Sequence, residues 1–331
     1  MKTLRSILTS AGIVIIGLSC LLSSCREDII ENDPLSLWND NAAKNAIVTL
    51  LKTVTDANNP DFLPEKDRVA VFDMDGTLLL EKPNYVLFDF VIRRLMEQIA
   101  GNPDLKKNQP YKAVFEQDWA YFGKLPLTGN DGLYGVLLYA FDGYTEDQYN
   151  DALRKYFTTV IDKRYNKTYN QLSFAPMVQL IRYLQENHFE VYIVSGSDVE
   201  FTRFFSQEAF HIPSQNVIGS TVLTRWVETE TGSYFVREHK FVEPINDIDG
   251  KPVNILNKIG KVPALAVGNS SGDYHMLEFS KNARRSLQMI VNHDDSVREY
   301  NYDAEKMKKM CLDNGWQEIS MKNDFNMIFG N

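Results

Sequence analysis

Two carboxylates separated by a single residue, Asp73 and Asp75, directly follow the apolar run Val69 to Phe72. Because no cationic residue lies between them, the two side chains would repel each other unless they share a proton or bind a cation. A hard divalent cation binds oxygen ligands, and magnesium is the commonest such cation beside phosphate groups. Gly76 permits a tight turn directly after the acids, and Thr77 supplies a hydroxyl group. This stretch therefore predicts a site for Mg²⁺ and phosphate chemistry.

The apolar run before the acids predicts a strand that is buried on both faces, as in a parallel sheet covered by helices. Two further apolar runs also end in polar residues: Val191 to Val194 precedes Ser195-Gly196-Ser197, and Ala264 to Val267 precedes Gly268 to Asp273. Open α/β sheets bind their ligands at the carboxyl ends of the strands. We therefore predict an α/β fold with a Rossmann-like parallel sheet core and helices on both faces.

Ser195 and Gly196 are candidate phosphate ligands because they follow the second apolar run. A helix is expected from about Asp198, and the amides of a first helical turn can bind an anion. The alternative is that Ser195 only caps this helix, since serine is common at that position.

The stretch Asp73-Met74-Asp75-Gly76-Thr77-Leu78 resembles the first motif of the haloacid dehalogenase (HAD) superfamily of phosphatases. In that family the first acid is the nucleophile and the second is a general acid and base. The resemblance gives these roles to Asp73 and Asp75. It also implies that Thr77 and Ser195 hold the phosphoryl group.

The stretch Gly268 to Asp273 resembles the fourth motif of the family, Gly-Asp-x-x-x-Asp, with Asn269 in place of the first acid. The resemblance implies that Mg²⁺ is held by Asp73, by the backbone carbonyl of Asp75, and by Asn269 or Asp273. An amide oxygen can bind magnesium but adds no charge, so the substitution predicts a weaker metal site or a larger contribution from Asp273.

Lys251 is our candidate for the lysine of the third motif, which neutralises the phosphate and the nucleophile. It follows a turn and precedes Pro252, a residue favoured at helix starts. Lys258 and Lys261 are rivals. The Gly-Lys pair ahead of a helix matches the family, whereas Lys258 falls inside the predicted helix.

The chain is predicted to have four parts. These are a lipoprotein signal peptide (1–24), a tether (25–45), an α/β core (46–85 and 169–331), and an inserted α-helical cap domain (86–168). Residues 86–168 show amphipathic, aromatic-rich helical patterns, and Thr145 with Gln148 forms a capping-box signature. The resemblance predicts a cap here in the phosphoserine-phosphatase-like branch. Thr221 to Trp226 and Tyr234 to Phe241 predict a hairpin appended to the sheet.

The amino terminus predicts export. Lys2 and Arg5 precede an apolar run, and Leu22-Ser23-Ser24-Cys25 resembles a bacterial lipoprotein cleavage box. Cys25 would then be lipidated, which would place the protein in the bacterial cell envelope, anchored to a membrane. The alternative is an uncleaved anchor helix. Cys311 would be the one cysteine left beyond the lipid site, so no disulfide is expected within the mature domain.

The charge balance argues for a small substrate. Loss of Lys2 and Arg5 with the leader would change the formal net charge from −9 to −11. An acidic surface of this kind does not favour nucleic acid.

These features together predict a magnesium-dependent phosphomonoesterase that acts on a small phosphorylated metabolite through an aspartyl-phosphate intermediate. Dehalogenase chemistry is a rival within the superfamily, although the Asp73-x-Asp75-x-Thr77 spacing favours phosphoryl transfer. A phosphomutase is disfavoured outside the cytoplasm. A lipoprotein that binds a ligand or partner without catalysis is an alternative from another class, and Asn269 is the residue that supports it.

Three further features have two interpretations each. The aromatic residues of the predicted cap either form a cage for a quaternary ammonium group or, as we expect, fill the core of the cap; they include Trp119, Tyr121, Tyr134, Tyr139 and Tyr144. His293, after a predicted strand, is either a substrate contact or a structural residue. Asp247 to Gly250 predicts a turn, because the downstream glutamate of a calcium-binding loop is missing.

Overall fold

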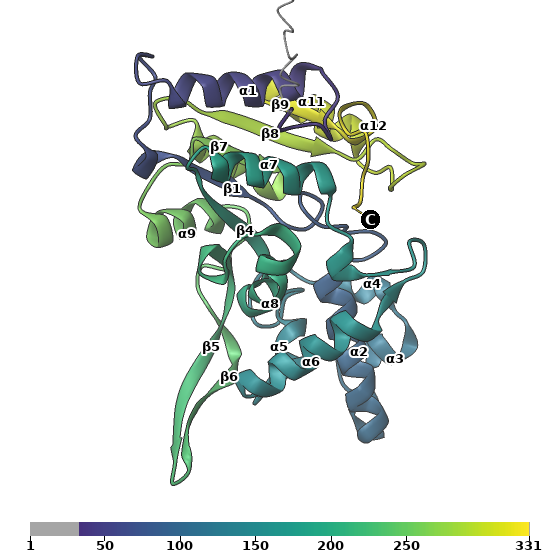
Figure 1. Cartoon of the computed structure of the whole chain (residues 1–331). Helices are drawn as coiled ribbons and strands as arrows, with labels where there is room; N and C mark the ends of the chain where they lie inside the picture. Colours follow the sequence, from purple (N-terminus) through teal and green to yellow (C-terminus); the bar gives the residue numbers. More distant parts are fainter. Residues whose placement is uncertain (1–32, 331) are drawn as a thin grey trace, which may run out of the picture. The chain divides into compact units, whose positions relative to one another are not determined.

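The computed structural model describes residues 33–330, which fold around a seven-stranded sheet (Figure 1). The strand order is β6-β5-β4-β1-β7-β8-β9. The strands are β1 (Val69–Phe72), β4 (Glu190–Asp198), β5 (Val217–Thr229), β6 (Gly232–Val242), β7 (Leu265–Gly268), β8 (Leu287–Asn292) and β9 (Gln317–Ser320). Every neighbouring pair is parallel except β5 and β6. The predicted α/β fold with a mostly parallel sheet is confirmed.

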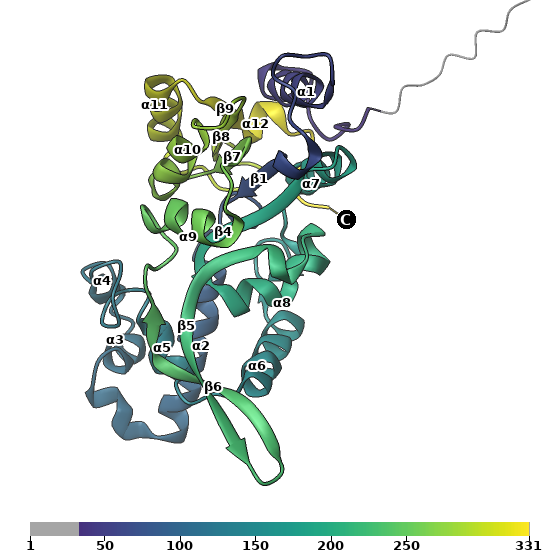
Figure 2. The ribbon, with the colours of Figure 1, turned by 90° about the vertical axis from the view of Figure 1, so that its left-hand side faces the viewer.

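Strand β1 lies at the centre of the sheet and is buried on both faces, which explains its unbroken apolar sequence. Ala70 and Phe72 belong to one apolar cluster, and Val69 and Val71 belong to another. The first cluster includes α1 (Ala42–Thr55), α7 (Ala175–Glu186) and α8 (Val199–Phe210); the second includes α9 (Gly250–Ile259), α10 (Tyr274–Ser280) and α11 (Ala304–Asn314). Figure 2 shows the sheet between the two sets of helices.

Residues 86–168, the inserted segment, follow β1 and form mainly helices. They comprise α2 (Val86–Gly101), α3 (Tyr111–Glu116), α4 (Trp119–Phe122), α5 (Val136–Phe141), α6 (Glu146–Thr159) and the short strands β2 (Ile161–Asp162) and β3 (Lys167–Thr168). The capping box of Thr145 and Gln148 starts α6 as predicted. The pairing of β2 with β3 was not predicted, because strands of two residues are too short to show an alternating pattern. The remaining short elements are α12 (Met321–Asp324) and 3-10 turns at Glu65–Asp67, Pro103–Lys107, Tyr169–Gln171, Ser214–Asn216 and Ser271–Asp273.

The hairpin of β5 and β6 is more than an appendage of the sheet, contrary to our prediction. Its Arg237 exchanges backbone hydrogen bonds with the inserted segment, to the amide of Gly143 (3.0 Å) and the carbonyl of Tyr144 (2.8 Å). In Figure 1 the hairpin runs past α5 and α6. It therefore joins the sheet to the inserted helices.

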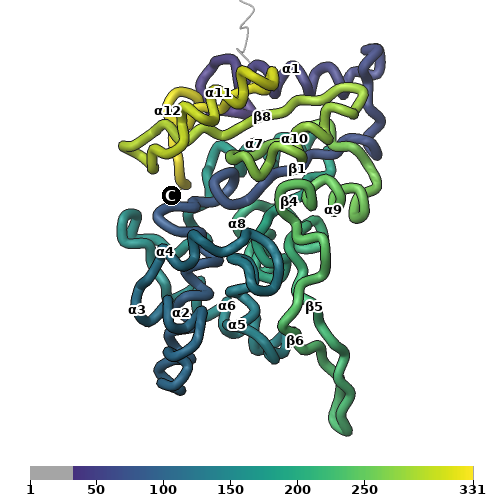
Figure 3. Tube along the Cα trace, turned by 180° about the vertical axis from the view of Figure 1, so that it is seen from behind, coloured from purple at the N-terminus to yellow at the C-terminus, as the bar shows by residue number. Residues whose placement is uncertain are grey.

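The predicted tether, 25–45, ends earlier than expected. Leu35 and Trp38 are buried, and the Trp38 indole donates a hydrogen bond to the carbonyl of Pro176 (2.9 Å) and packs edge-on against Phe325. The average polarity of this stretch hid two apolar residues that pack on the core. Figure 3 shows α1 beside the carboxyl-terminal helices α11 and α12. The predicted signal peptide, Cys25 and the start of the tether lie outside the described residues. Within residues 33–330, no helix combines the length and the apolar character that crossing a membrane requires.

Candidate active site

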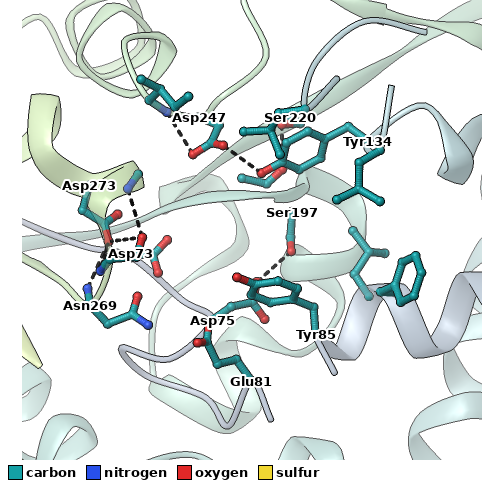
Figure 4. A pocket seen from close by; sticks show the side chains of 18 of the residues that line it. Asp73, Asp75, Glu81, Tyr85, Tyr134, Ser197, Ser220, Asp247, Asn269 and Asp273 are labelled. Atoms are coloured by element: carbon teal, nitrogen blue, oxygen red, sulfur yellow. Dashed lines mark hydrogen bonds between the residues drawn. The ribbon is translucent and has the colours of Figure 1, made fainter. Parts of the chain in front are cut away.

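The carboxyl ends of β1, β4 and β7 meet at one cavity of about 470 Å³ (Figure 4). Of the predicted site residues, six line it: Asp73, Asp75, Gly196, Lys251, Asn269 and Asp273. Thr77 and Ser195 are fully buried beside this cavity. Residues that lie almost 200 positions apart in the sequence are thus brought together, because adjacent parallel strands end at the same edge.

Lys251 joins the two acids that follow β1 and β7. Its Nζ atom donates to Asp73 Oδ1 at 2.7 Å and to Asp273 Oδ1 at 2.6 Å, and all three side chains are buried. Burial raises the pKa of Asp73 well above its usual value, against the opposing effect of Lys251. Burial alone would lower the pKa of Lys251, but Asp273 and Asp73 raise it above its usual value. The lysine is therefore a permanent cation beside the Asp73 carboxylate.

The rival lysines, Lys258 and Lys261, do not line the cavity. Lys258 is exposed on α9, and Lys261 donates to the backbone carbonyl of Lys66. The geometry therefore favours Lys251 as the phosphate-binding lysine. Helix α9 begins at Gly250, two residues before the proline that we expected at its start.

The environment of Asp75 favours the protonated form of its carboxyl group near neutral pH. The hydroxyl of Ser197 donates to its Oδ2 atom at 2.8 Å, and its buried Oδ1 atom has no hydrogen-bond partner within residues 33–330. Burial raises the pKa of Asp75 to about 7; the hydrogen bond from Ser197 opposes this shift, and the charge of Glu81 adds to it. A carboxyl group with such a pKa can both donate and accept a proton at physiological pH.

Ser197, which was not predicted as a site residue, lines the cavity beside the predicted Ser195. The Ser195 hydroxyl accepts from the Ser197 amide at 3.1 Å, whereas Ser197 and Gly196 line the cavity. The register of β4 against β5 shifts between Val194 and Asp198. Irregularities of this kind redirect side chains beside active sites, and no sequence pattern marked this one.

Gly196 permits a close approach by the inserted segment. A Cβ atom at this position would lie 2.4 Å from the hydroxyl oxygen of Tyr134. That hydroxyl donates to Asp247 Oδ2 at 3.1 Å, so the inserted segment and the loop before α9 meet over the strand tip. Asp247 forms part of the predicted turn, but its contribution to the cavity was not predicted.

The turn that follows Asp73 and Asp75 is fixed by close contacts of Gly76 with Asn269 and His293. Gly76 has φ of +76°, and a Cβ atom there would lie 1.9 Å from the side-chain nitrogen of Asn269. The buried His293 ring contacts the Gly76 carbonyl through Nε2 (2.7 Å) and Glu299 through Nδ1 (3.0 Å). Since a carbonyl oxygen only accepts, Nε2 must carry a proton, which fixes the ring. His293 thus has a structural contact, and it also lines the cavity.

The aromatic cage considered from the sequence is absent among the described residues. Of the five aromatic residues named for it, only Tyr134 lines the cavity, and Trp119 is half exposed at the surface. Sequence reasoning also missed Glu81 and Tyr85, which lie beside Asp75 (Figure 4). Glu81 and Tyr85 lie in the loop between β1 and α2, and no motif marked them.

The donor set fits a magnesium ion. Asp73 Oδ2 and Asn269 Oδ1 both lie 3.4 Å from the hydroxyl of Thr77, so the two oxygens converge on one region of the cavity. Both Asp273 oxygens are already occupied, by Lys251 and by the backbone amides of Asn269 and Ser270. No cluster of three His, Cys, Asp or Glu residues that could hold a metal occurs in the part of the chain described. An amide, a carboxylate and a backbone carbonyl are nevertheless oxygen donors suited to Mg²⁺.

The mostly parallel sheet, with acids at the carboxyl ends of its strands, places the protein in the α/β class. The family of haloacid dehalogenase-like hydrolases matches residues 70–278, and the chain belongs to this family. No curated protein matches the chain.

Among the solved structures with a similar fold are two proteins of unknown function. One is a conserved protein of unknown function from Anaerococcus prevotii DSM 20548, with 16% identity over 84% of this chain and 91% of that chain and a TM-score of 0.56. The other is a protein of unknown function from Bordetella pertussis Tohama I, with 16% identity over 76% of this chain and 98% of that chain and a TM-score of 0.52. A phosphoserine phosphohydrolase-like protein from Francisella tularensis has 18% identity over 73% of this chain and 92% of that chain, with a TM-score of 0.40.

Proposed function

We propose that this protein is a magnesium-dependent phosphomonoesterase of the phosphoserine-phosphatase-like type that acts on a small phosphorylated metabolite. The observation that carries the proposal is the Asp73 carboxylate on the cavity wall, paired with Lys251 at 2.7 Å and followed by the proton-holding Asp75. A nucleophile, a fixed cation and an acid are the groups that a two-step phosphoryl transfer needs.

In the first step, a carboxylate oxygen of Asp73 attacks phosphorus, and the bond from phosphorus to the alcohol oxygen breaks. Asp75 gives its proton to the departing alkoxide, which leaves as the alcohol. In the second step, Asp75 takes a proton from a water molecule that attacks the aspartyl-phosphate. Inorganic phosphate then leaves, and both acids return to their starting states.

The charge of the phosphoryl group is balanced by fixed groups. Lys251, whose ammonium group contacts Asp73, supplies a positive charge. Mg²⁺, held by Asp73, the Asp75 carbonyl and Asn269, would neutralise negative charge on the phosphoryl oxygens when bound. The inserted segment contributes Tyr134 to the cavity and would limit access of water.

The test is phosphate release from a panel of phosphomonoesters by the protein lacking residues 1–25, with Mg²⁺ and then with a chelator. Turnover that the chelator abolishes and Mg²⁺ restores is expected. A folded sample that releases no phosphate in the presence of Mg²⁺ would favour a binding protein without catalysis.

The pH dependence of hydrolysis should report the proton on Asp75. Because Asp75 must be protonated in the first step, hydrolysis of an alkyl phosphate should slow as the pH rises above about 7. Ser197→Ala removes a hydrogen bond that favours the carboxylate, so the pKa of Asp75 should rise and the decline should move to higher pH. p-Nitrophenyl phosphate, whose leaving group needs no proton, serves as the control. An unmoved alkaline limb in Ser197→Ala would be evidence against Asp75 as the acid.

Asn269→Asp should strengthen the metal site. The substitution adds one negative charge among the oxygen donors, so the Mg²⁺ concentration for half-maximal activity should fall, by on the order of tenfold. Asn257→Asp, on the exposed face of α9, is the matched control. Identical magnesium titrations of the two variants would show that Asn269 is not a ligand.

We also propose that the protein is exported and anchored through a lipid on Cys25. The full chain, expressed in a bacterium with lipoprotein processing, should partition into the detergent phase of a phase-separating detergent. Cys25→Ala should abolish this partitioning, whereas Cys20→Ala, within the predicted leader, should preserve it. Retained partitioning of Cys25→Ala would indicate an uncleaved anchor helix instead.

A further inference from the structure

The direction of the Asp75 carbonyl group is set by the turn that contains it. No backbone amide of residues 33–330 donates a hydrogen bond to this oxygen. The next amide along the chain, that of Gly76, donates to the carbonyl of Leu79 at 2.7 Å. In a planar trans peptide the N–H and C=O groups point in opposite directions. The Asp75 carbonyl therefore points away from Leu79, and its oxygen is left for a cation.

Gly76 is the flexible link in this turn. It joins the peptide plane of the Asp75 carbonyl to the next plane, and glycine restricts rotation about φ and ψ less than any other residue. The two planes keep their directions only if contacts hold both of them. The first plane is held by the bond to Leu79, and the second by His293, whose Nε2 atom donates to the Gly76 carbonyl at 2.7 Å. His293 thus completes the fixation of the turn.

The His293 ring is itself held on its other side. Its Nδ1 atom lies 3.0 Å from Oε2 of Glu299, and the Tyr302 ring stacks on it with the centroids 4.3 Å apart. The backbone amide of Tyr302 also donates to the carbonyl of His293. Whichever partner carries the proton between Nδ1 and Glu299, this contact occupies Nδ1 and leaves the Nε2–H group for Gly76.

The burial of Glu299 needs an explanation. This carboxyl group is fully buried, His293 is its ion-pair partner, and its Oε1 atom has no hydrogen-bond partner within residues 33–330. Acidic side chains are almost never fully buried unless they are paired. A carboxyl group behind a histidine is a common means of orienting groups around a metal.

We propose that His293, held by Glu299, is a positioning residue that sets the direction of the Asp75 carbonyl and thereby the affinity for Mg²⁺. The inference rests on the proposed function, because it concerns the metal site of the proposed phosphatase. His293 is not itself a ligand, since Gly76 and Glu299 occupy its two ring nitrogens.

Two amide side chains can separate the two contacts of the ring. The side-chain nitrogen of glutamine is as many bonds from the backbone as Nε2 of histidine, and that of asparagine is as many as Nδ1. His293→Gln therefore keeps a donor for Gly76 and loses the contact with Glu299. His293→Asn keeps a contact with Glu299 and loses the donor for Gly76.

The measurement is Mg²⁺ binding by calorimetry in the absence of substrate. His293→Asn should weaken binding by about 10- to 100-fold, and His293→Gln should stay within about threefold of the wild type. His293→Gln should be less stable, because Glu299 is left unpaired, and adding Glu299→Gln should restore its stability. Wild-type affinity in His293→Asn, or an equal loss of affinity in both single variants, would overturn the proposal.

Gln288→Ala is the matched control for loss of a buried polar contact. Gln288 lies on β8, is buried, and donates to the hydroxyls of Ser280 and Ser286 at 2.9 Å, but it does not line the cavity. This variant should be less stable than the wild type and should bind Mg²⁺ equally well. A weakened affinity in Gln288→Ala would overturn a specific role of His293, because any disturbance of β8 would then have the same effect.

Phosphate release distinguishes failure of this proposal from failure of the proposed function. Saturating Mg²⁺ should restore most of the turnover of His293→Asn with an unchanged KM for the ester; turnover that stays low would overturn the proposal. Mg²⁺ binding that depends on His293, in a protein that hydrolyses no ester, would contradict the phosphatase function alone. Magnesium-dependent hydrolysis by the wild type, with wild-type Mg²⁺ affinity in His293→Asn, would contradict this inference alone.

Discussion

Asp73→Asn is expected to abolish turnover while the fold is retained. The amide has the same shape as the carboxylate, and its oxygen can still accept from Lys251, but it is a far weaker nucleophile. Loss of a nucleophile that forms a covalent intermediate typically costs about 10⁴-fold or more in kcat. Because Lys251 keeps the Asp273 carboxylate as its partner, removing the charge of Asp73 should lower the melting temperature only slightly.

The measurement is phosphate release together with trapping of the phosphorylated protein. The wild type, quenched in acid during turnover, should retain label from a radioactive ester, and Asp73→Asn should retain none. Asp313→Asn is the matched control, because Asp313, on α11, is exposed, pairs with Lys309 and does not line the cavity. Full activity in Asp73→Asn would contradict the mechanism.

The sheet was predictable because the sequences of its central strands are themselves typical of buried strands. The runs ending at Phe72, Val194 and Val267 are apolar throughout and stop at polar residues, as strands buried on both faces do. The structure places these strands next to one another as β4, β1 and β7. Motif spacing then indicated which polar residues would meet at their ends.

The part of the cavity that is lined by Glu81, Tyr85 and Tyr302 was not predictable by the same reasoning. Glu81, Tyr85 and Tyr302 lie in connections, where position is set by contacts made far along the chain. Tyr302 is held by its ring contact with His293, which in turn holds the Gly76 carbonyl. No local pattern encodes such a chain of contacts.

The contribution of Ser197 was missed for a different reason. Ser195 was chosen because it directly follows an apolar run, but the sheet continues to Asp198 with a shift in register. A one-residue irregularity changes which side chains face a ligand. The sequence Ser195-Gly196-Ser197 offers two hydroxyls, and only the structure distinguishes them.

Lys251→Met is expected to lower both activity and stability. The substitution keeps the length of the side chain but leaves the buried Asp73 and Asp273 carboxylates facing each other without the cation that both contact. Removal of one partner from a buried ion pair typically costs about 3–5 kcal/mol of folding free energy. Turnover should fall by about 10³-fold, because a fixed positive charge beside the phosphoryl group is lost.

The controls separate the structural from the catalytic effect. Lys258→Met changes an exposed lysine of the same helix and should alter neither denaturant unfolding nor phosphate release by more than a small factor. Adding Asp273→Asn to Lys251→Met removes one of the two unpaired charges, so stability should be largely restored while activity is not. If the double variant also regained activity, Lys251 would serve only to neutralise buried acids. If Lys251→Met were as stable and active as the wild type, the buried arrangement of Asp73, Lys251 and Asp273 would not describe the working site.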